Sequence, residues 1–272
     1  MQIPSYYHGK RVIVTGAASG MGQAVARMLV ERSADVISLD INPASDGKSM
    51  RVDLTNRASI DDALSVIGAP VHALFSSAGL PHGPGIDPQK VFAVNFIGMR
   101  YLTEKMFETM EPGSAAVTVS SVAGLAWQQS HDLLRELMET DWDGAVEWAR
   151  AHPDFISEKT CYTASKQAAT YYTMYKCRAF TERGMRLNTV SPGPTVTGMT
   201  PIFNAANSEA YMANLRAALG RDGTAEDQAN AMLFLNDGSV ASYVNGTNLY
   251  VDNGMAARRL VGQFDISAAR TA

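Results

Sequence analysis

The stretch TCYTASKQAA contains Tyr162 four residues before Lys166, and a phenol beside an ammonium group could carry out acid–base chemistry. A free phenol has a pKa of about 10 and is a poor base at neutral pH, but a nearby positive charge favours its ionised form. Residues at this spacing share one face of a helix. Spacing alone does not select the pair, because it recurs at Tyr6 and Lys10, Tyr101 and Lys105, and Tyr172 and Lys176.

The surrounding elements separate the four pairs. Tyr162 and Lys166 fall in the first turns of a helix predicted over 158–184, whereas Tyr101 comes late in a helix predicted over 88–110. Tyr172 lies ten residues beyond Tyr162, almost three helical turns further on. Tyr6 precedes the first predicted strand. Ligands bind beyond the carboxyl ends of the strands in open α/β sheets, so the sequence favours Tyr162 and Lys166.

Short apolar runs alternate with helical patterns along the whole chain. The runs predict strands at 11–16, 35–40, 49–54, 71–77, 114–121, 185–191 and 246–252. Helices are expected at 21–33, 56–68, 88–110, 158–184, 205–219 and 225–236. This alternation is typical of a doubly wound parallel sheet between two layers of helices. With no repeat or linker, we expect one domain over 1–272, ending in a tail at 256–272.

The segment 128–158 interrupts the alternation, because two short amphipathic helices are expected at 130–140 and 141–153. It behaves as an insertion between a strand and the helix that carries Tyr162. Its tryptophans and leucines need cover, so we expect it to form a wall of the substrate site or a subunit interface, with a solvated surface hairpin as the alternative.

Composition excludes several classes of function. The formal net charge of −4 and the pI near 5.7 give no reason to expect binding to nucleic acid or to an anionic membrane surface. No apolar stretch approaches the length of a membrane span, and the first residues do not resemble a signal peptide. The two cysteines lie on one predicted helix, too far apart to bridge. We therefore expect a cytoplasmic protein. The five histidines show no metal-ligand spacing.

The motif TGAASGMG follows the first strand and opens the first helix. Glycines at this spacing allow a tight turn, close approach of the backbone to a pyrophosphate, and binding of the anion at the helix N-terminus. Asp40 ends the second strand, where a carboxylate accepts hydrogen bonds from an adenosine ribose and repels a 2′-phosphate. Neither Ser19 nor Ile41 supplies a cation, so the sequence predicts NAD rather than NADP.

These motifs, with AVNFIG, VTVSS, YTASK and NTVSPGPTVTGM, occur in the order found in the short-chain dehydrogenase/reductase family, which the chain resembles over residues 10–255. The resemblance implies a Rossmann-type fold, an NAD(H) site in the first half and a homodimer or homotetramer. It assigns Tyr162 as the acid/base and Lys166 as the group that lowers the pKa of Tyr162 and holds the ribose. Ser121 would orient the reacting oxygen, and Asn95 would hold a water next to Lys166.

The remaining positions implied by the resemblance contact the cofactor. They are the loop residues Gly16, Ser19, Gly20, Met21 and Gly22; Asp40; Asp53 and Leu54 beside the adenine; Ala78 and Gly79 along the ribose; and Pro192, Gly193, Thr195 and Thr197 at the nicotinamide. The chain departs from the family pattern at Asn253, which replaces a glycine and is expected to adopt a left-handed conformation. Ser121 also precedes Tyr162 by 41 residues, far more than the family's usual spacing.

The long spacing resembles the branch that contains bacterial 3α-hydroxysteroid dehydrogenase/carbonyl reductases, and several motifs are similar to those of coniferyl alcohol dehydrogenases. The resemblance implies an NAD-dependent enzyme that transfers hydride to or from a bulky apolar secondary alcohol or ketone. An aryl allylic alcohol is the alternative substrate. A non-catalytic NAD(H)-binding redox sensor is the alternative from another class, although the complete set of Ser121, Tyr162 and Lys166 argues against it.

Overall fold

In the part of the chain that the structure describes, seven parallel strands form one sheet in the order β3-β2-β1-β4-β5-β6-β7. The structure is a computed structural model that describes residues 5–68, 70–205, 209, 212–213, 215 and 219–263. The strands are β1 Arg11–Thr15, β2 Asp35–Asp40, β3 Lys48–Arg51, β4 Ala73–Ser76, β5 Ala115–Val119, β6 Arg186–Pro192 and β7 Asn248–Val251. The direction of strand order reverses between β1 and β4, as in doubly wound sheets. All seven predicted strands and the Rossmann-type fold are confirmed.

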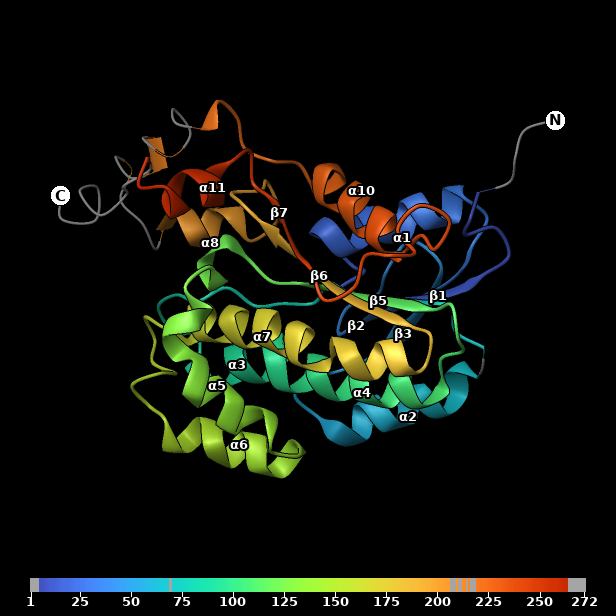
Figure 1. The fold of residues 1–272 in the computed structure, drawn as a ribbon, viewed down its shortest axis with the longest axis horizontal. Helices are drawn as coiled ribbons and strands as arrows, with labels where there is room; N and C mark the ends of the chain where they lie inside the picture. Colours follow the sequence, from blue (N-terminus) through green and yellow to red (C-terminus); the bar gives the residue numbers. More distant parts are fainter. Residues whose placement is uncertain are drawn as a thin grey trace.

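Helices cover both faces of the sheet (Figure 1). One face carries α1 Gly20–Glu31 and α10 Ala225–Asn236, and the other carries α2 Arg57–Ile67, α4 Met99–Thr109 and α7 Cys161–Glu182. Every residue of β4 and β5 is buried, which explains why these strands read as continuous apolar runs. Two buried clusters, one on each side of the sheet, make up most of the core.

The helix predicted over 88–110 is continuous but not regular. It begins as α3 Pro88–Phe92, passes through a π-helical turn, η1 Ala93–Gly98, and continues as α4. A π turn inserts extra backbone into a helix and often occurs at functional sites. Here it contains Asn95. The long helix predicted over 88–110 is confirmed, and the π-helical turn within it is a feature that the sequence pattern did not indicate.

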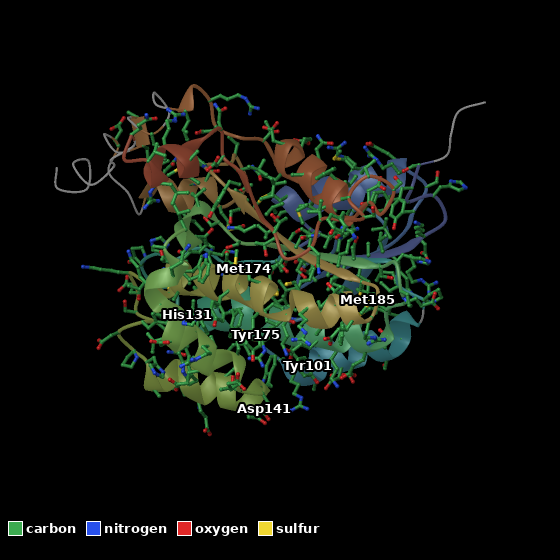
Figure 2. The ribbon with its side chains drawn as sticks, in the orientation of Figure 1. Tyr101, His131, Asp141, Met174, Tyr175 and Met185 are labelled. Atoms are coloured by element: carbon green, nitrogen blue, oxygen red, sulfur yellow. The ribbon has the colours of Figure 1, made fainter. Side chains whose placement is uncertain are left out.

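The insertion forms α5 His131–Met138 and α6 Trp142–Ala151, close to the predicted bounds. Its inner face is buried: Leu134 and Leu137 are fully covered, and Trp148 stacks on Phe92 of α3 with ring centres 6.3 Å apart. Figure 2 shows His131 at the start of α5 and Asp141 between α5 and α6, in a segment that lies against α7 near Tyr175. The alternative of a solvated hairpin is therefore wrong.

Arg100 of α4 ties the insertion to the rest of the fold. Its buried guanidinium donates hydrogen bonds to the backbone oxygens of Leu137 (3.0 Å), Met138 (3.4 Å) and Thr140, and it pairs with Glu104 at 3.1 Å. These oxygens lie at the C-terminus of α5, where a helix favours positive charge. The cap explains how a segment with no strand of its own is held in place.

Three further expectations concern the second half of the chain. Asn253 has a φ of 51°, so its predicted left-handed conformation is confirmed. The helix expected near 205–219 lies mostly outside the described residues, although α8 Thr200–Ala205 precedes it. The tail begins as α11 Met255–Leu260, and positions from 264 onward are outside the described part. No helix among the described residues has the length and apolar character needed to span a membrane.

Candidate active site

Two adjoining cavities lie at the carboxyl ends of the strands. The larger, of about 430 Å³, follows the loop after β1 and the ends of β2 and β4. The smaller, of about 220 Å³, lies between Ser121, Tyr162 and the loop after β6. Six residues line both: Met21, Ser77, Gly79, Leu80, Thr197 and Met199. The two cavities therefore form one cleft along the edge of the sheet.

The glycine loop is packed so closely that side chains would not fit at two of its positions. A Cβ on Gly16 would lie 2.7 Å from the backbone of Ala78, and Gly16 has a φ of 70°. A Cβ on Gly22 would lie 2.2 Å from the carbonyl oxygen of Gly16. Such contacts are too short for real atoms, so both positions require glycine. Gly16, Ser19, Gly20 and Met21 line the larger cavity, whereas Gly22 packs behind the loop.

Asp40 connects the end of β2 to the glycine loop. Its two carboxylate oxygens accept hydrogen bonds from the backbone N–H groups of Ala18 (3.1 Å) and Asn42 (2.9 Å). It lines the larger cavity together with Asp53. Burial by itself would raise the pKa of Asp53, but hydrogen bonds from Thr55 and the charges of Lys90 and Arg51 together outweigh it, and the net effect is a lowered pKa. Both carboxylates therefore face this part of the cleft.

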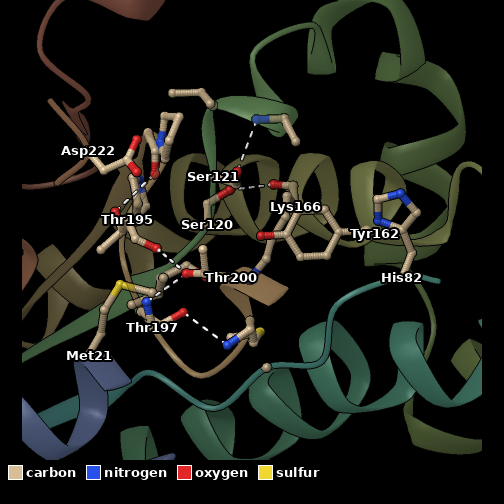
Figure 3. A pocket seen from close by; sticks show the side chains of 18 of the residues that line it. Met21, His82, Ser120, Ser121, Tyr162, Lys166, Thr195, Thr197, Thr200 and Asp222 are labelled. Carbon is tan, nitrogen blue, oxygen red and sulfur yellow. Dashed lines mark hydrogen bonds between the residues drawn. The ribbon is translucent and has the colours of Figure 1, made fainter. Parts of the chain in front are cut away.

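Tyr162, Ser121 and Lys166 converge in the smaller cavity (Figure 3). Tyr162 and Lys166 lie in the first turns of α7, and Ser121 follows β5. Lys166 Nζ donates a hydrogen bond to the backbone oxygen of Val119 at 2.9 Å and lies 5.5 Å from the centre of the Tyr162 ring. Ser121 is hydrogen-bonded to Tyr162. The structure thus brings together three side chains that are up to 45 residues apart in the sequence.

The packing of α7 against the turn after β5 fixes this arrangement. Ser120 donates a hydrogen bond to the backbone oxygen of Lys166 at 2.7 Å. Gly124, in the turn η2 Val122–Gly124, approaches the same backbone so closely that a Cβ would lie 2.8 Å from it. Ser121 starts this turn, and its Oγ accepts a hydrogen bond from Ala123 N. The position of Ser121 relative to α7 is therefore set mainly by backbone contacts.

Burial disfavours the charged form of both α7 groups, so it shifts their pKa values in opposite directions. It raises the pKa of Tyr162, and the hydrogen bond from Ser121 offsets this only in part. It lowers the pKa of Lys166 to about 8. Both shifts follow from the cost of a charge away from water. Lys166 is not among the causes that shift the Tyr162 pKa, and the expected lowering of that pKa by Lys166 together with NAD⁺ stays a prediction.

Asn95 is buried beneath the loop that follows β4. Its side-chain amide donates to Leu80 O (3.0 Å) and Ser165 Oγ (3.1 Å), and its Oδ1 accepts from Leu80 N at 2.7 Å. The amide thus holds both polar groups of the Leu80 backbone and links them to α7. That Asn95 also holds a water next to Lys166 stays a prediction.

The loop after β6 closes the smaller cavity on the side opposite His82 (Figure 3). Pro192, Gly193, Thr195 and Thr197 all line it. Hydrogen bonds within the loop hold it, since Thr195 Oγ1 donates to Gly193 O at 3.0 Å and Thr200 Oγ1 accepts from Thr197 N at 2.8 Å. Ala78, Gly79 and Leu54 line the larger cavity.

The structure also decides what the sequence left open about the lining. No residue between 124 and 161 lines the smaller cavity, so the insertion does not form its wall. Sequence reasoning missed several lining residues, among them His82, Met199, Met212 and Met255. The place of His82, shortly after β4, was a usable signal, because loops at this end of a sheet carry ligand sites. The described residues hold no group of three or more potential metal-binding side chains.

Each half of the chain matches a family model. The family model described as "short chain dehydrogenase" matches residues 10–131, and that described as "Enoyl-(Acyl carrier protein) reductase" matches residues 149–256. A coniferyl-alcohol dehydrogenase from Pseudomonas sp. (strain HR199) is 30% identical over 91% of this chain and 97% of its own. A 3-alpha-hydroxysteroid dehydrogenase/carbonyl reductase from Comamonas testosteroni is 26% identical over 93% and 99%.

A solved structure shows the same fold. The 3-alpha-hydroxysteroid dehydrogenase from Pseudomonas sp. B-0831, complexed with NADH, superimposes with a TM-score of 0.76 at 26% identity. The match covers 94% of this chain and all of that one. The likeness therefore extends over nearly the whole fold.

Proposed function

Because the chain belongs to the short-chain dehydrogenase/reductase family of oxidoreductases, we propose that it is an NAD-dependent dehydrogenase acting on a bulky, apolar alcohol or ketone. One observation carries the proposal: Tyr162, Ser121 and Lys166 meet in a cavity that continues into the cleft over the glycine loop. A dinucleotide in that cleft and an alcohol beside Tyr162 would then lie end to end.

The larger cavity fits NAD better than NADP. At Gly16 and Gly22 the backbone packs too closely for a side chain, and glycines at such positions let the loop approach a pyrophosphate. The Asp40 carboxylate suits the hydroxyls of a ribose and would repel a 2′-phosphate. Lys90 lines the same cavity, and its charge contributes to the lowered pKa of Asp53. These features support NAD, and one solved relative at 26% identity is described as complexed with NADH.

Bound NAD⁺ would supply a hydride acceptor at C4 of its nicotinamide. The residues of the chain would manage the proton and the oxygen. Tyr162 takes the proton from the substrate hydroxyl, and Ser121 donates a hydrogen bond to the same oxygen as its charge changes. Lys166, whose pKa is about 8, is mostly charged at neutral pH, so its ammonium is available to favour the phenolate and hold the ribose. Asn95 holds the loop at Leu80.

The cavity beside Tyr162 favours an apolar substrate. Its lining includes Leu80, Val122, Met199, Met212 and Met255, and methionine adapts its shape to bulky apolar groups. A cyclic secondary alcohol, such as a hydroxysteroid, is our first candidate. An aryl allylic alcohol is the second, since the 30% identical relative is a coniferyl-alcohol dehydrogenase.

The proposal is tested by following NADH absorbance while NAD⁺ or NADP⁺ is offered with sterols, terpenoids, aryl alcohols and sugars. We expect turnover of an apolar alcohol, with kcat/KM at least about tenfold higher for NAD⁺. A preference for NADP⁺ would refute the role of Asp40. Binding of NADH with no turnover of any alcohol or ketone would favour the redox-sensor alternative.

The proposal also includes the oligomeric state of the protein and its location in the cell. A homodimer or homotetramer stays a prediction that analytical ultracentrifugation would test. A cytoplasmic location is likewise a prediction, and cell fractionation would test it.

A further inference from the structure

The loop after β4 carries a histidine, His82, that the proposed chemistry does not use. The backbone just before it is fixed, because Asn95 binds both the N–H and the carbonyl oxygen of Leu80. Pro81 is buried and Pro84 follows three residues later, and each proline ring restricts its own φ. The backbone that leads into His82 is therefore held in place by Asn95 and Pro81.

The imidazole of His82 lies against the ring of Tyr162. The two ring centres are 5.8 Å apart, and the planes are inclined by 35°. Figure 3 shows the Tyr162 hydroxyl pointing toward Ser121, with His82 beyond the opposite end of the phenol ring. His82 is only partly buried and lines the smaller cavity. It thus faces the space over Tyr162 without approaching the oxygen that exchanges the proton.

The loop that carries His82 also contacts α8, on the opposite side of the cavity. Gly83 packs against Ile202 of α8, since a Cβ on Gly83 would lie 3.3 Å from the Ile202 side chain. Met199 and Thr200, at the start of α8, line the same cavity. The space between His82 and α8 is therefore bounded on both sides by elements that contact one another.

On the basis of the proposed function, we propose that His82 is a specificity-determining residue that hydrogen-bonds a second oxygen of the substrate. The reacting carbon must lie at the Tyr162 hydroxyl and Ser121. A six-membered ring that contains that carbon, or carries it on a short chain, and that lies along the phenol would bring its far substituent to the imidazole. A neutral imidazole offers one donor and one acceptor nitrogen, so it suits a hydroxyl or carbonyl oxygen. The substrate class is an apolar ring with an oxygen at each end.

Two other roles for His82 have to be separated from the proposed one, the first by geometry and the second by a substitution. A proton relay would require the imidazole near the Tyr162 hydroxyl, and it lies at the other end of the ring. A purely packing role would be served equally well by phenylalanine, which keeps the ring contact and has no hydrogen-bonding atom. The variant His82→Phe therefore distinguishes a packing role from a hydrogen-bonding role.

The experiment compares two pairs of alcohols, cyclohexanol with cyclohexane-1,4-diol and cinnamyl alcohol with 4-hydroxycinnamyl alcohol. Binding to the protein in the presence of NAD⁺ is measured by calorimetry, and hydride transfer is measured separately as kcat/KM. His82→Phe removes the hydrogen bond, and His82→Gln keeps a donor and an acceptor. His8→Phe, at an exposed histidine far from the cleft, is the matched control, and circular dichroism checks that each variant is folded.

We expect the wild type to prefer the doubly oxygenated member of at least one pair by about tenfold in binding and in kcat/KM. His82→Phe should bring the two members close to parity, while His82→Gln and His8→Phe keep a preference. Equal preference in the wild type and His82→Phe, or equal loss in the Phe and Gln variants, overturns the inference, as does the absence of binding by every probe. A binding preference that His82→Phe removes, without hydride transfer, supports the role of His82 and refutes the proposed activity.

Discussion

Replacing Lys166 with methionine should change how the stability of the fold depends on pH. The Lys166 side chain is only 4% exposed, and burial lowers its pKa from 10.5 to about 8. In the unfolded chain the same group would titrate at its ordinary pKa. Between these two values the unfolded chain carries a proton that the folded chain has lost, so the free energy of unfolding must rise with pH in that interval.

The size of the effect follows from the two pKa values. At 1.36 kcal/mol for each pH unit, the interval from 10.5 to about 8 corresponds to roughly 3 kcal/mol of folding free energy. Below the lower value both states are protonated, and the fold bears the full cost of the buried ammonium. From about pH 7.5 to about pH 9.5, the wild type should therefore gain about 2 kcal/mol relative to Lys166→Met.

Urea denaturation of the cofactor-free protein, repeated across this range, measures the difference directly. Lys166→Met removes the titrating group but keeps most of the side-chain volume, and contributions from other groups cancel between the two proteins. Lys176→Met is the matched control, since Lys176 lies on the same helix with 32% of its side chain exposed. If the wild-type and Lys166→Met curves run parallel across the range, the reasoning about the buried ammonium is wrong.

Three further predictions concern the site and its support. Tyr162→Phe should lower kcat by about a thousandfold or more while NADH still binds, because it removes the acid/base and keeps the ring; kinetics and calorimetry test this. Gly22→Ala should weaken NADH binding more than tenfold (roughly 1.4 kcal/mol or more), since its Cβ would lie 2.2 Å from Gly16 O. Arg100→Met should destabilise the fold by about 3 kcal/mol in urea, because the C-terminus of α5 loses its buried cap.

Each of these predictions has a control elsewhere in the chain. Tyr101→Phe removes a hydroxyl far from the cleft and should leave kcat unchanged. Gly113→Ala introduces strain at a φ of 90° with no nearby atom, so it should affect stability and not NADH binding. Arg178→Met removes an 88% exposed side chain and should cost little. Turnover by Tyr162→Phe, normal NADH binding by Gly22→Ala, or an unchanged urea midpoint for Arg100→Met would contradict the corresponding argument.

The insertion shows which structural features local sequence patterns predict and which they do not. Its two helices were predictable, because amphipathic spacing and the stop at Pro153 are local signals. What their apolar faces cover was not, since Trp148 packs on Phe92 and Arg100 caps α5 from a segment 37 residues earlier than Leu137. The same periodicity is compatible with a cavity wall, an interface or a core contact.

The sequence by itself determined the strands, their alternation with helices, and the glycine loop that opens α1. It also singled out Tyr162 by its place at the start of the helix after β5. These features depend on neighbouring residues, because strand and helix periodicity and the left-handed conformation of Gly16 are properties of short segments. Only the tertiary structure decided that Asn95 holds Leu80, that His82 lies over Tyr162, and that burial dominates both pKa values. Contacts and burial depend on segments far apart in the chain, which no local pattern records.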